Sequence, residues 1–180
     1  MTTDKIDRAT TPWRWLGWGG AAALLSVPWF AGFPWTLSDY VVMGVLFGIV
    51  GLLFELATRI SRNRWYRAGA AVTVAGVFLL IWVNLAVGFL GDEDNRANLI
   101  FFGVLAVAFV GGALGRFRAG AMARAMTLTA AVQVAVGAGA WTAGWALPGY
   151  DGVYEVLLGT TMFTGLWLVA AGFFLRAADG

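Results

Sequence analysis

Residues 83–118 read VNLAVGFLGDEDNRANLIFFGVLAVAFVGGALGRFR and decide the fold. Two apolar runs flank the acidic turn GDEDN, and Arg116 and Arg118 close the second run. A helix satisfies its own backbone hydrogen bonds, so an apolar run of about 20 residues is typical of a membrane span. The stretch therefore predicts two membrane-spanning helices joined by an acidic turn.

The rest of the chain has the same composition. Of its 180 residues, 60% are hydrophobic and 12% are charged, about half the charge of a soluble domain. Residues 1–12 are polar and predict a disordered tail, and residues 13–180 predict a single membrane domain without room for a soluble one. We expect an all-α bundle of six transmembrane helices in three antiparallel hairpins, with spans at about 16–33, 40–60, 68–90, 97–115, 122–146 and 153–175.

The first of these runs also has the charged start and apolar middle of a signal peptide. Its exit, AGFPW, lacks the small-residue cleavage pattern, so we interpret it as a retained span. Pro28 predicts a kink or an end of the helix. In the next turn, Ser38 and Asp39 are expected N-caps of the second span.

Positive residues set the expected orientation. All 12 lysines and arginines except Arg96 fall on the side of the predicted bundle that carries the N-terminus. Asp39, Asp94, Asp151 and Glu155 fall on the other side. Because cytoplasmic loops are enriched in Lys and Arg, both termini are predicted to be cytoplasmic, in a bacterial inner membrane.

Composition excludes several kinds of chemistry. The chain has no cysteine and no histidine, which removes disulfides, thiolate nucleophiles and the usual zinc and haem ligands. The net charge of +2 comes from arginines beside apolar runs, so anionic lipid headgroups are expected partners and nucleic acid is not. No activated Ser or paired-Asp site is evident, so we expect no catalytic residues, no metal, no cofactor and no enzyme activity.

Three polar residues stand inside apolar runs: Glu55, Asn84 and Gln133. A membrane carboxylate is a candidate for proton or substrate handling, whereas here Arg59, four residues on, also allows a local ion pair near the cytoplasmic surface. A buried amide either bonds to a neighbouring helix or lines a polar path. The three residues together define the expected path if the protein is a transporter or channel.

Two further groups of residues have expected roles in lipid and helix contacts. Exposed arginines at helix ends are expected to hold lipid headgroups, and small residues four apart allow close helix packing, within one bundle or between copies. The headgroup contacts are Arg62, Arg64, Arg116, Arg118 and Arg124, and the packing residues are Gly44, Gly48, Gly111, Gly115, Ala135 and Gly139.

The acidic turn has the oxygen density of a calcium loop but not its pattern. Ala97 stands where the EF-hand glycine belongs, and Gly103 stands where the closing glutamate belongs. We interpret the turn as a solvated connection in which Asp94 or Asn95 caps the next helix.

Four segments resemble a family of small multi-pass bacterial membrane proteins: WTLSDYVVMGVL at 35–46, FELATR at 54–59, the run 82–107 that contains GDEDNRANL, and GRFRAGAMARAM at 115–126. The resemblance covers about the middle 100 residues. Relatives often carry proline where this chain has Arg96, so position 96 receives no family role. The resemblance implies a bacterial inner-membrane bundle and no activity, substrate or cofactor.

Two functions follow as hypotheses. The first is a non-catalytic membrane component, either a homo-oligomer or an accessory subunit that packs against other membrane subunits through small residues. The second is a small ion or solute transporter or channel that uses Glu55, Asn84 and Gln133. Convergence of the three polar residues on one cavity would favour the second.

Overall fold

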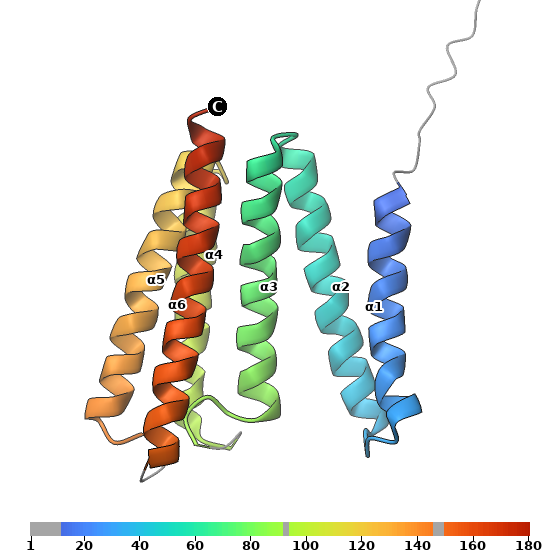
Figure 1. Cartoon of the computed structure of the whole chain (residues 1–180), viewed down its shortest axis with the longest axis vertical. Helices are drawn as coiled ribbons and strands as arrows, with labels where there is room; N and C mark the ends of the chain where they lie inside the picture. Colours follow the sequence, from blue (N-terminus) through green and yellow to red (C-terminus); the bar gives the residue numbers. More distant parts are fainter. Residues whose placement is uncertain (1–11, 92–93, 146–149) are drawn as a thin grey trace, which may run out of the picture. The chain divides into compact units, whose positions relative to one another are not determined.

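The computed structural model describes residues 12–91, 94–145 and 150–180. The described residues form six α-helices and one short 3₁₀-helix, and none of them is in a β-strand. The predicted tail, Asp92 and Glu93 of the acidic turn, and the turn at Pro148 lie outside the described residues. Figure 1 shows the helices, which are α1 (Pro12–Ala31), α2 (Leu37–Ile60), α3 (Arg64–Ala86), η1 (Arg96–Leu99), α4 (Ile100–Leu114), α5 (Ala119–Thr142) and α6 (Tyr150–Ala178).

Five segments are long and apolar enough to cross a membrane: Leu37–Ile60, Arg64–Ala86, Arg96–Leu114, Ala119–Thr142 and Gly152–Ala178. The predictions of an all-helical fold and of several helices able to span a membrane are confirmed for the described residues. Helix α1 is not one of the five. Its 20 residues still match the length that a span requires.

The chain divides into two compact units, residues 1–53 and residues 54–180. In the first unit, the indole ring of Trp18 on α1 occupies the space where a Cβ at Gly51 on α2 would lie. Gly44 faces Leu25 at an ordinary van der Waals distance, and nothing lies near Gly48. Of the two glycines expected to pack in α2, only Gly44 therefore has a partner in its own unit.

The ends of α1 and α2 differ from expectation. Helix α1 continues through Pro28 to Ala31, where Gly32 takes a positive φ of 70° and the amide of Phe33 donates to the Pro28 carbonyl at 3.0 Å. This is a glycine-terminated helix end. Asp39 lies inside the first turn of α2, and its carboxylate accepts hydrogen bonds from the amide and hydroxyl of Thr36 at 2.7 and 2.8 Å.

Helix α3 begins and ends four residues earlier than the apolar run suggested. Asn63 caps its start, since the Asn63 side chain accepts hydrogen bonds from the amides of Trp65 and Tyr66. At the other end Gly88 has a φ of 79°, and its amide donates to the Val83 carbonyl. The apolar run continues beyond the helix because Phe89 and Leu90 turn back into the core, where both are buried.

In the second unit, α6 is the central helix. It packs along both α3 and α5, and α5 packs along α4, whereas α3 and α4 meet only narrowly. Gly69 faces Phe174 and Gly76 faces Trp167, so residue numbers rise on α3 as they fall on α6, and the two helices are antiparallel. The main partner of α3 is thus α6, not the helix that follows it in sequence (Figure 1).

The core of this unit lies along α6. Its largest fully buried side chains include Trp167, Phe163 and Phe174 on α6 and Phe101 on α4. The ring of Phe89, which follows α3, lies tilted against two others, with its centroid 4.1 Å from that of Phe101 and 5.8 Å from that of Phe163. Aromatic rings from three segments therefore close one end of the unit around α6.

Candidate functional site: buried polar residues between α3, α5 and α6

Gln133 is fully buried in the middle of α5. Neither its amide oxygen nor its amide nitrogen has a hydrogen-bond partner. Asn84 on α3 is 6% exposed; its Nδ2 donates to the Leu80 carbonyl at 2.6 Å, and its Oδ1 has no partner. Both amides expected to be buried are buried, and both retain unused hydrogen-bonding capacity.

A set of polar groups on α6 was not predicted from the sequence. Thr160, Thr164 and Trp167 are four and three residues apart, so they share one helix face. The Oγ1 atoms of both threonines and the Nε1 atom of Trp167 are buried without a hydrogen-bond partner. The signal that could have revealed them is the spacing of two threonines and one deep tryptophan on a single face.

Contacts between α5 and α6 show that these polar groups lie at neighbouring heights, or levels, along the bundle axis. Gly137 on α5 lies directly against Thr160 on α6, and Gln133 is one helical turn before Gly137, as Thr164 is one turn after Thr160. Because α5 and α6 run in opposite directions at this contact, Gln133 and Thr164 share the next level. The five unpartnered atoms of Gln133, Thr160, Thr164 and Trp167 thus lie at successive levels over about two helical turns.

Asn84 lies close to this series along the bundle axis. The hydroxyl of Thr73 on α3 contacts the sulfur of Met126 on α5 at 3.4 Å. Because α3 and α5 are both antiparallel to α6, they run in the same direction. Seven residues beyond the Thr73–Met126 contact, Leu80 on α3 therefore lies at the same level as Gln133 on α5. Asn84 is then one turn further, at about the level of Gly137 and Thr160.

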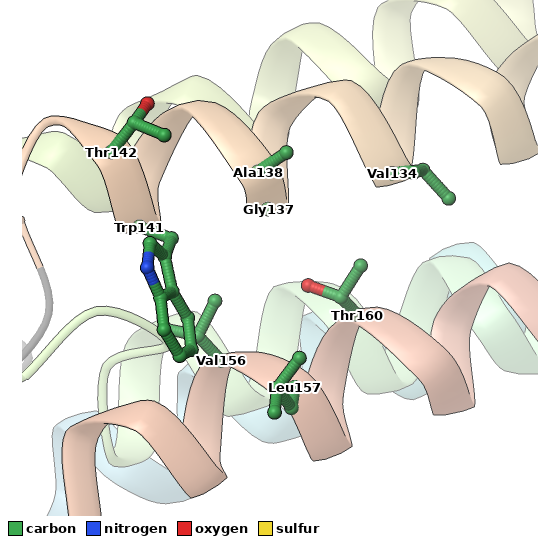
Figure 2. A pocket seen from close by; sticks show the side chains of 8 residues that line it. All are labelled: Val134, Gly137, Ala138, Trp141, Thr142, Val156, Leu157 and Thr160. Carbon is green, nitrogen blue, oxygen red and sulfur yellow. The ribbon is translucent and has the colours of Figure 1, made fainter.

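A groove opens between α5 and α6 beside Thr160 (Figure 2). Its volume is about 370 Å³. Its lining is almost wholly apolar and comes from the last turns of α5 and the first turns of α6. The lining residues are Val134, Gly137, Ala138, Trp141, Thr142, Val156, Leu157 and Thr160.

Glu55 does not line this groove. Its carboxylate forms an ion pair with Arg59 on the next turn of α2 at 2.8 Å, which confirms the local pairing that the sequence indicated. Glu55 is partly buried and Arg59 is exposed. The structure therefore places two of the three predicted path residues, Asn84 and Gln133, about one helical turn apart along the bundle axis. The third, Glu55, is paired with Arg59 on its own helix.

The arginines expected to hold lipid headgroups are all exposed: Arg62, Arg64, Arg116, Arg118 and Arg124. Arg176, at the end of α6, is exposed as well. The guanidinium carbons of Arg64 and Arg176 lie 5.0 and 5.1 Å from the ring centre of Trp65, so the start of α3 and the end of α6 meet in a cationic cluster on one indole.

Two of the predicted packing residues, Gly111 and Gly115, lie against Ala125 and Ala121 of α5. This is packing inside the unit, between α4 and α5. Ala135 and Gly139 are exposed, and a Cβ at Gly139 would meet nothing within 4 Å.

The connection from α3 to α4 is organised by asparagines. Asn95, not Asp94, caps η1 by accepting a hydrogen bond from the Ala97 amide. The Asn98 side chain accepts hydrogen bonds from the buried amides of Phe89 and Leu90 at 3.0 and 2.7 Å, a role that the sequence did not reveal. Within the described ranges, no group of three acidic residues could hold a metal ion.

Comparison of the chain with protein-family models, with curated proteins and with solved structures gives no match.

Proposed function

We propose that this protein is a non-catalytic, six-span component of a bacterial inner membrane, with both termini in the cytoplasm, and that it acts as a subunit of a larger membrane assembly. The exposed small-residue face of α5, formed by Ala131, Ala135 and Gly139, carries the proposal. Within the second unit no described helix lies against this face, since Ala131, Ala135 and Gly139 are all exposed and nothing lies within 4 Å of a Cβ built at Gly139. Small residues let a partner helix approach closely in lipid.

The occupant we propose is a transmembrane helix of another membrane polypeptide. The test is a photo-crosslinking amino acid at Ala135 or Gly139 in native membranes, with Leu168 and Val169 on the exposed face of α6 as matched control positions. We expect discrete protein adducts from α5 and only lipid adducts from α6, and the mass of each adduct separates a second copy from a different subunit. Lipid adducts alone from all four positions would contradict the proposal.

A second candidate function is transport of a small ion or solute. The observation that favours it is the unused hydrogen-bonding capacity of Asn84 and Gln133 in the interior. The Glu55–Arg59 ion pair speaks against a continuous path through Glu55. Flux into vesicles containing the reconstituted protein should fall in Gln133→Leu if this function is right, and flux unchanged in Gln133→Leu and Glu55→Ala would remove it.

A further inference from the structure

The start of α3 and the end of α6 are held together by aromatic rings. Trp65 on α3 stacks on Phe173 of α6, with ring centroids 5.9 Å apart and an angle of 19° between the ring planes. One residue further along each helix, the ring of Tyr66 meets that of Phe174 edge to face at 5.2 Å. Two neighbouring aromatic contacts therefore fix this end of α3 against α6.

These contacts bring two arginines from distant parts of the chain to one indole. The guanidinium carbons of Arg64 and Arg176 lie 5.0 and 5.1 Å from the centre of the Trp65 ring, and both side chains are exposed. Two charges on one ring lie within about 10 Å of each other, a distance over which salt does not fully screen their repulsion. The pair therefore carries an excess of positive charge that an anion would reduce.

The guanidinium groups of this pair have no acceptor in the part of the chain that the structure describes. Arg67, by contrast, donates to the carbonyl oxygens of Ser61 and Thr58, both at 3.1 Å. Arg64 and Arg176 make no such hydrogen bond, and no ion pair, to a described residue. Attraction of a cation to an aromatic ring uses no acceptor atom, so the N–H groups of both arginines remain available to a ligand.

The backbone at the start of α3 is already satisfied. Asn63 accepts hydrogen bonds from the amides of Trp65 and Tyr66, and the amide of Arg67 donates to the Asn63 carbonyl at 3.1 Å. An anion here would therefore bind to the guanidinium groups and not to the helix N-terminus. A guanidinium offers two parallel N–H groups, which match two oxygens of a phosphate.

The position of the pair favours a lipid as the source of the phosphate. Arg64 is the first residue of the candidate span Arg64–Ala86, and Arg176 lies in the last turn of the candidate span Gly152–Ala178. Tryptophan is enriched at this level of a membrane protein, where the headgroups lie. A lipid whose headgroup carries an ammonium would be repelled by the two arginines, whereas a headgroup with net negative charge would not.

We infer that Arg64 and Arg176 together bind the phosphate group of an anionic phospholipid beside Trp65. The sequence predicts Arg64 as one of five separate headgroup contacts, whereas the pairing of α3 with α6 joins it to Arg176 in a single site. The inference is independent of the small-residue face of α5 that carries the proposed function.

The test uses the full chain in phosphatidylcholine nanodiscs that contain a trace of photoactivatable phosphatidylglycerol, with a diazirine near its headgroup. We expect saturable labelling at the start of α3 and the end of α6, displaced when unlabelled phosphatidylglycerol is added to the bilayer. Equal labelling by a photoactivatable phosphatidylcholine would overturn the inference. Glycerol phosphate in the aqueous phase separates the two sources of phosphate. We expect it not to compete, and displacement of the lipid by it would overturn the assignment to a lipid.

Two pairs of substitutions separate a specific site from general attraction to positive charge. Arg64→Gln with Arg176→Gln should lower labelling at this site about tenfold. Arg116→Gln with Arg124→Gln removes the same charge from exposed arginines of α5 and of the turn before it. This control should lower the labelling less than about threefold, because charges away from the site are screened.

Further variants leave the net charge unchanged. Trp65→Leu should weaken the labelling severalfold, because both guanidinium groups lose the ring that holds them. If Trp65→Leu lowers thermal stability, Arg64→Lys with Arg176→Lys tests the same point, since lysine keeps the charge and lacks the planar guanidinium. Equal loss in the two glutamine pairs, or full labelling in the variants of unchanged charge, would show that charge alone attracts the lipid and would overturn the inference.

Discussion

Gly137 leaves no space for a methyl group where α5 meets α6. A Cβ there would collide with the hydroxyl, the methyl group and the Cβ of Thr160, so rotation of that side chain cannot relieve the contact. We expect Gly137→Ala to destabilise the protein by about 1–3 kcal/mol, measured by thermal unfolding in detergent. Gly139→Ala is the matched control, because nothing lies within 4 Å of its new Cβ and alanine favours the helix. Equal melting temperatures for the two variants would contradict the contact.

Asn98 is expected to hold the segment that follows α3 in place through its side chain. Its side-chain oxygen accepts hydrogen bonds from two buried backbone amides, those of Phe89 and Leu90. Asn98→Ala leaves both amides unpaired, at a cost of about 1–3 kcal/mol for each group. Faster hydrogen exchange at residues 89 and 90 is the expected result, and Leu99→Ala, at an exposed neighbour, should leave it unchanged. Retained protection in Asn98→Ala would show that the loop does not depend on this side chain.

The candidate site was partly predictable at the level of single residues. Asn84 and Gln133 are evident in the sequence because a side-chain amide inside an apolar run needs a hydrogen-bond partner in the interior of the bundle. Thr160 and Thr164 were missed because most helical threonines bond to their own helix, as Thr73 does. Only the three-dimensional contact with Gly137 shows that Thr160 faces another helix.

At the scale of elements, glycines set the distance between α3 and α6. A Cβ at Gly76 would lie 2.9 Å from the nearest ring atom of Trp167, which is fully buried. Gly76→Val should therefore separate the two helices and lower the unfolding temperature by several degrees. Gly172→Val on the open face of α6 is the control and should have little effect. The pairing of α3 with α6 would be contradicted if Gly172→Val were the more damaging change.

Helix existence was predictable and helix pairing was not. Apolar runs locate every described helix, because lipid leaves the backbone no other way to satisfy its hydrogen bonds. The observed helix ends differ from the predicted ones by up to four residues. A capping residue such as Asn63, or a glycine with positive φ such as Gly88, ends a helix at a position that the apolar run does not mark. The packing of α3 on α6 depends on side-chain fit between distant segments, which hydropathy does not encode.

At the scale of the whole molecule, the cationic cluster on Trp65 offers a test of lipid contact. Arg64 and Arg176 approach the same indole, and no acidic partner is found for either among the described residues. A phosphate group between them would relieve their mutual repulsion, so Arg64→Gln with Arg176→Gln should retain fewer phosphatidylglycerol molecules in native mass spectrometry. Arg96→Gln is the control, because it makes the same substitution at an exposed arginine outside this cluster. Loss of lipid from the control alone would contradict the assignment.

Membrane orientation underlies every functional proposal made for this chain, and the absence of natural cysteine makes it directly measurable. The decisive measurement is labelling of single cysteines, introduced at Asp94 or at Arg62, by an impermeant maleimide in intact spheroplasts. The account predicts that Asp94→Cys is labelled in intact spheroplasts and that Arg62→Cys is labelled only after lysis. Labelling of Arg62→Cys in intact spheroplasts, with Asp94→Cys protected, would contradict it.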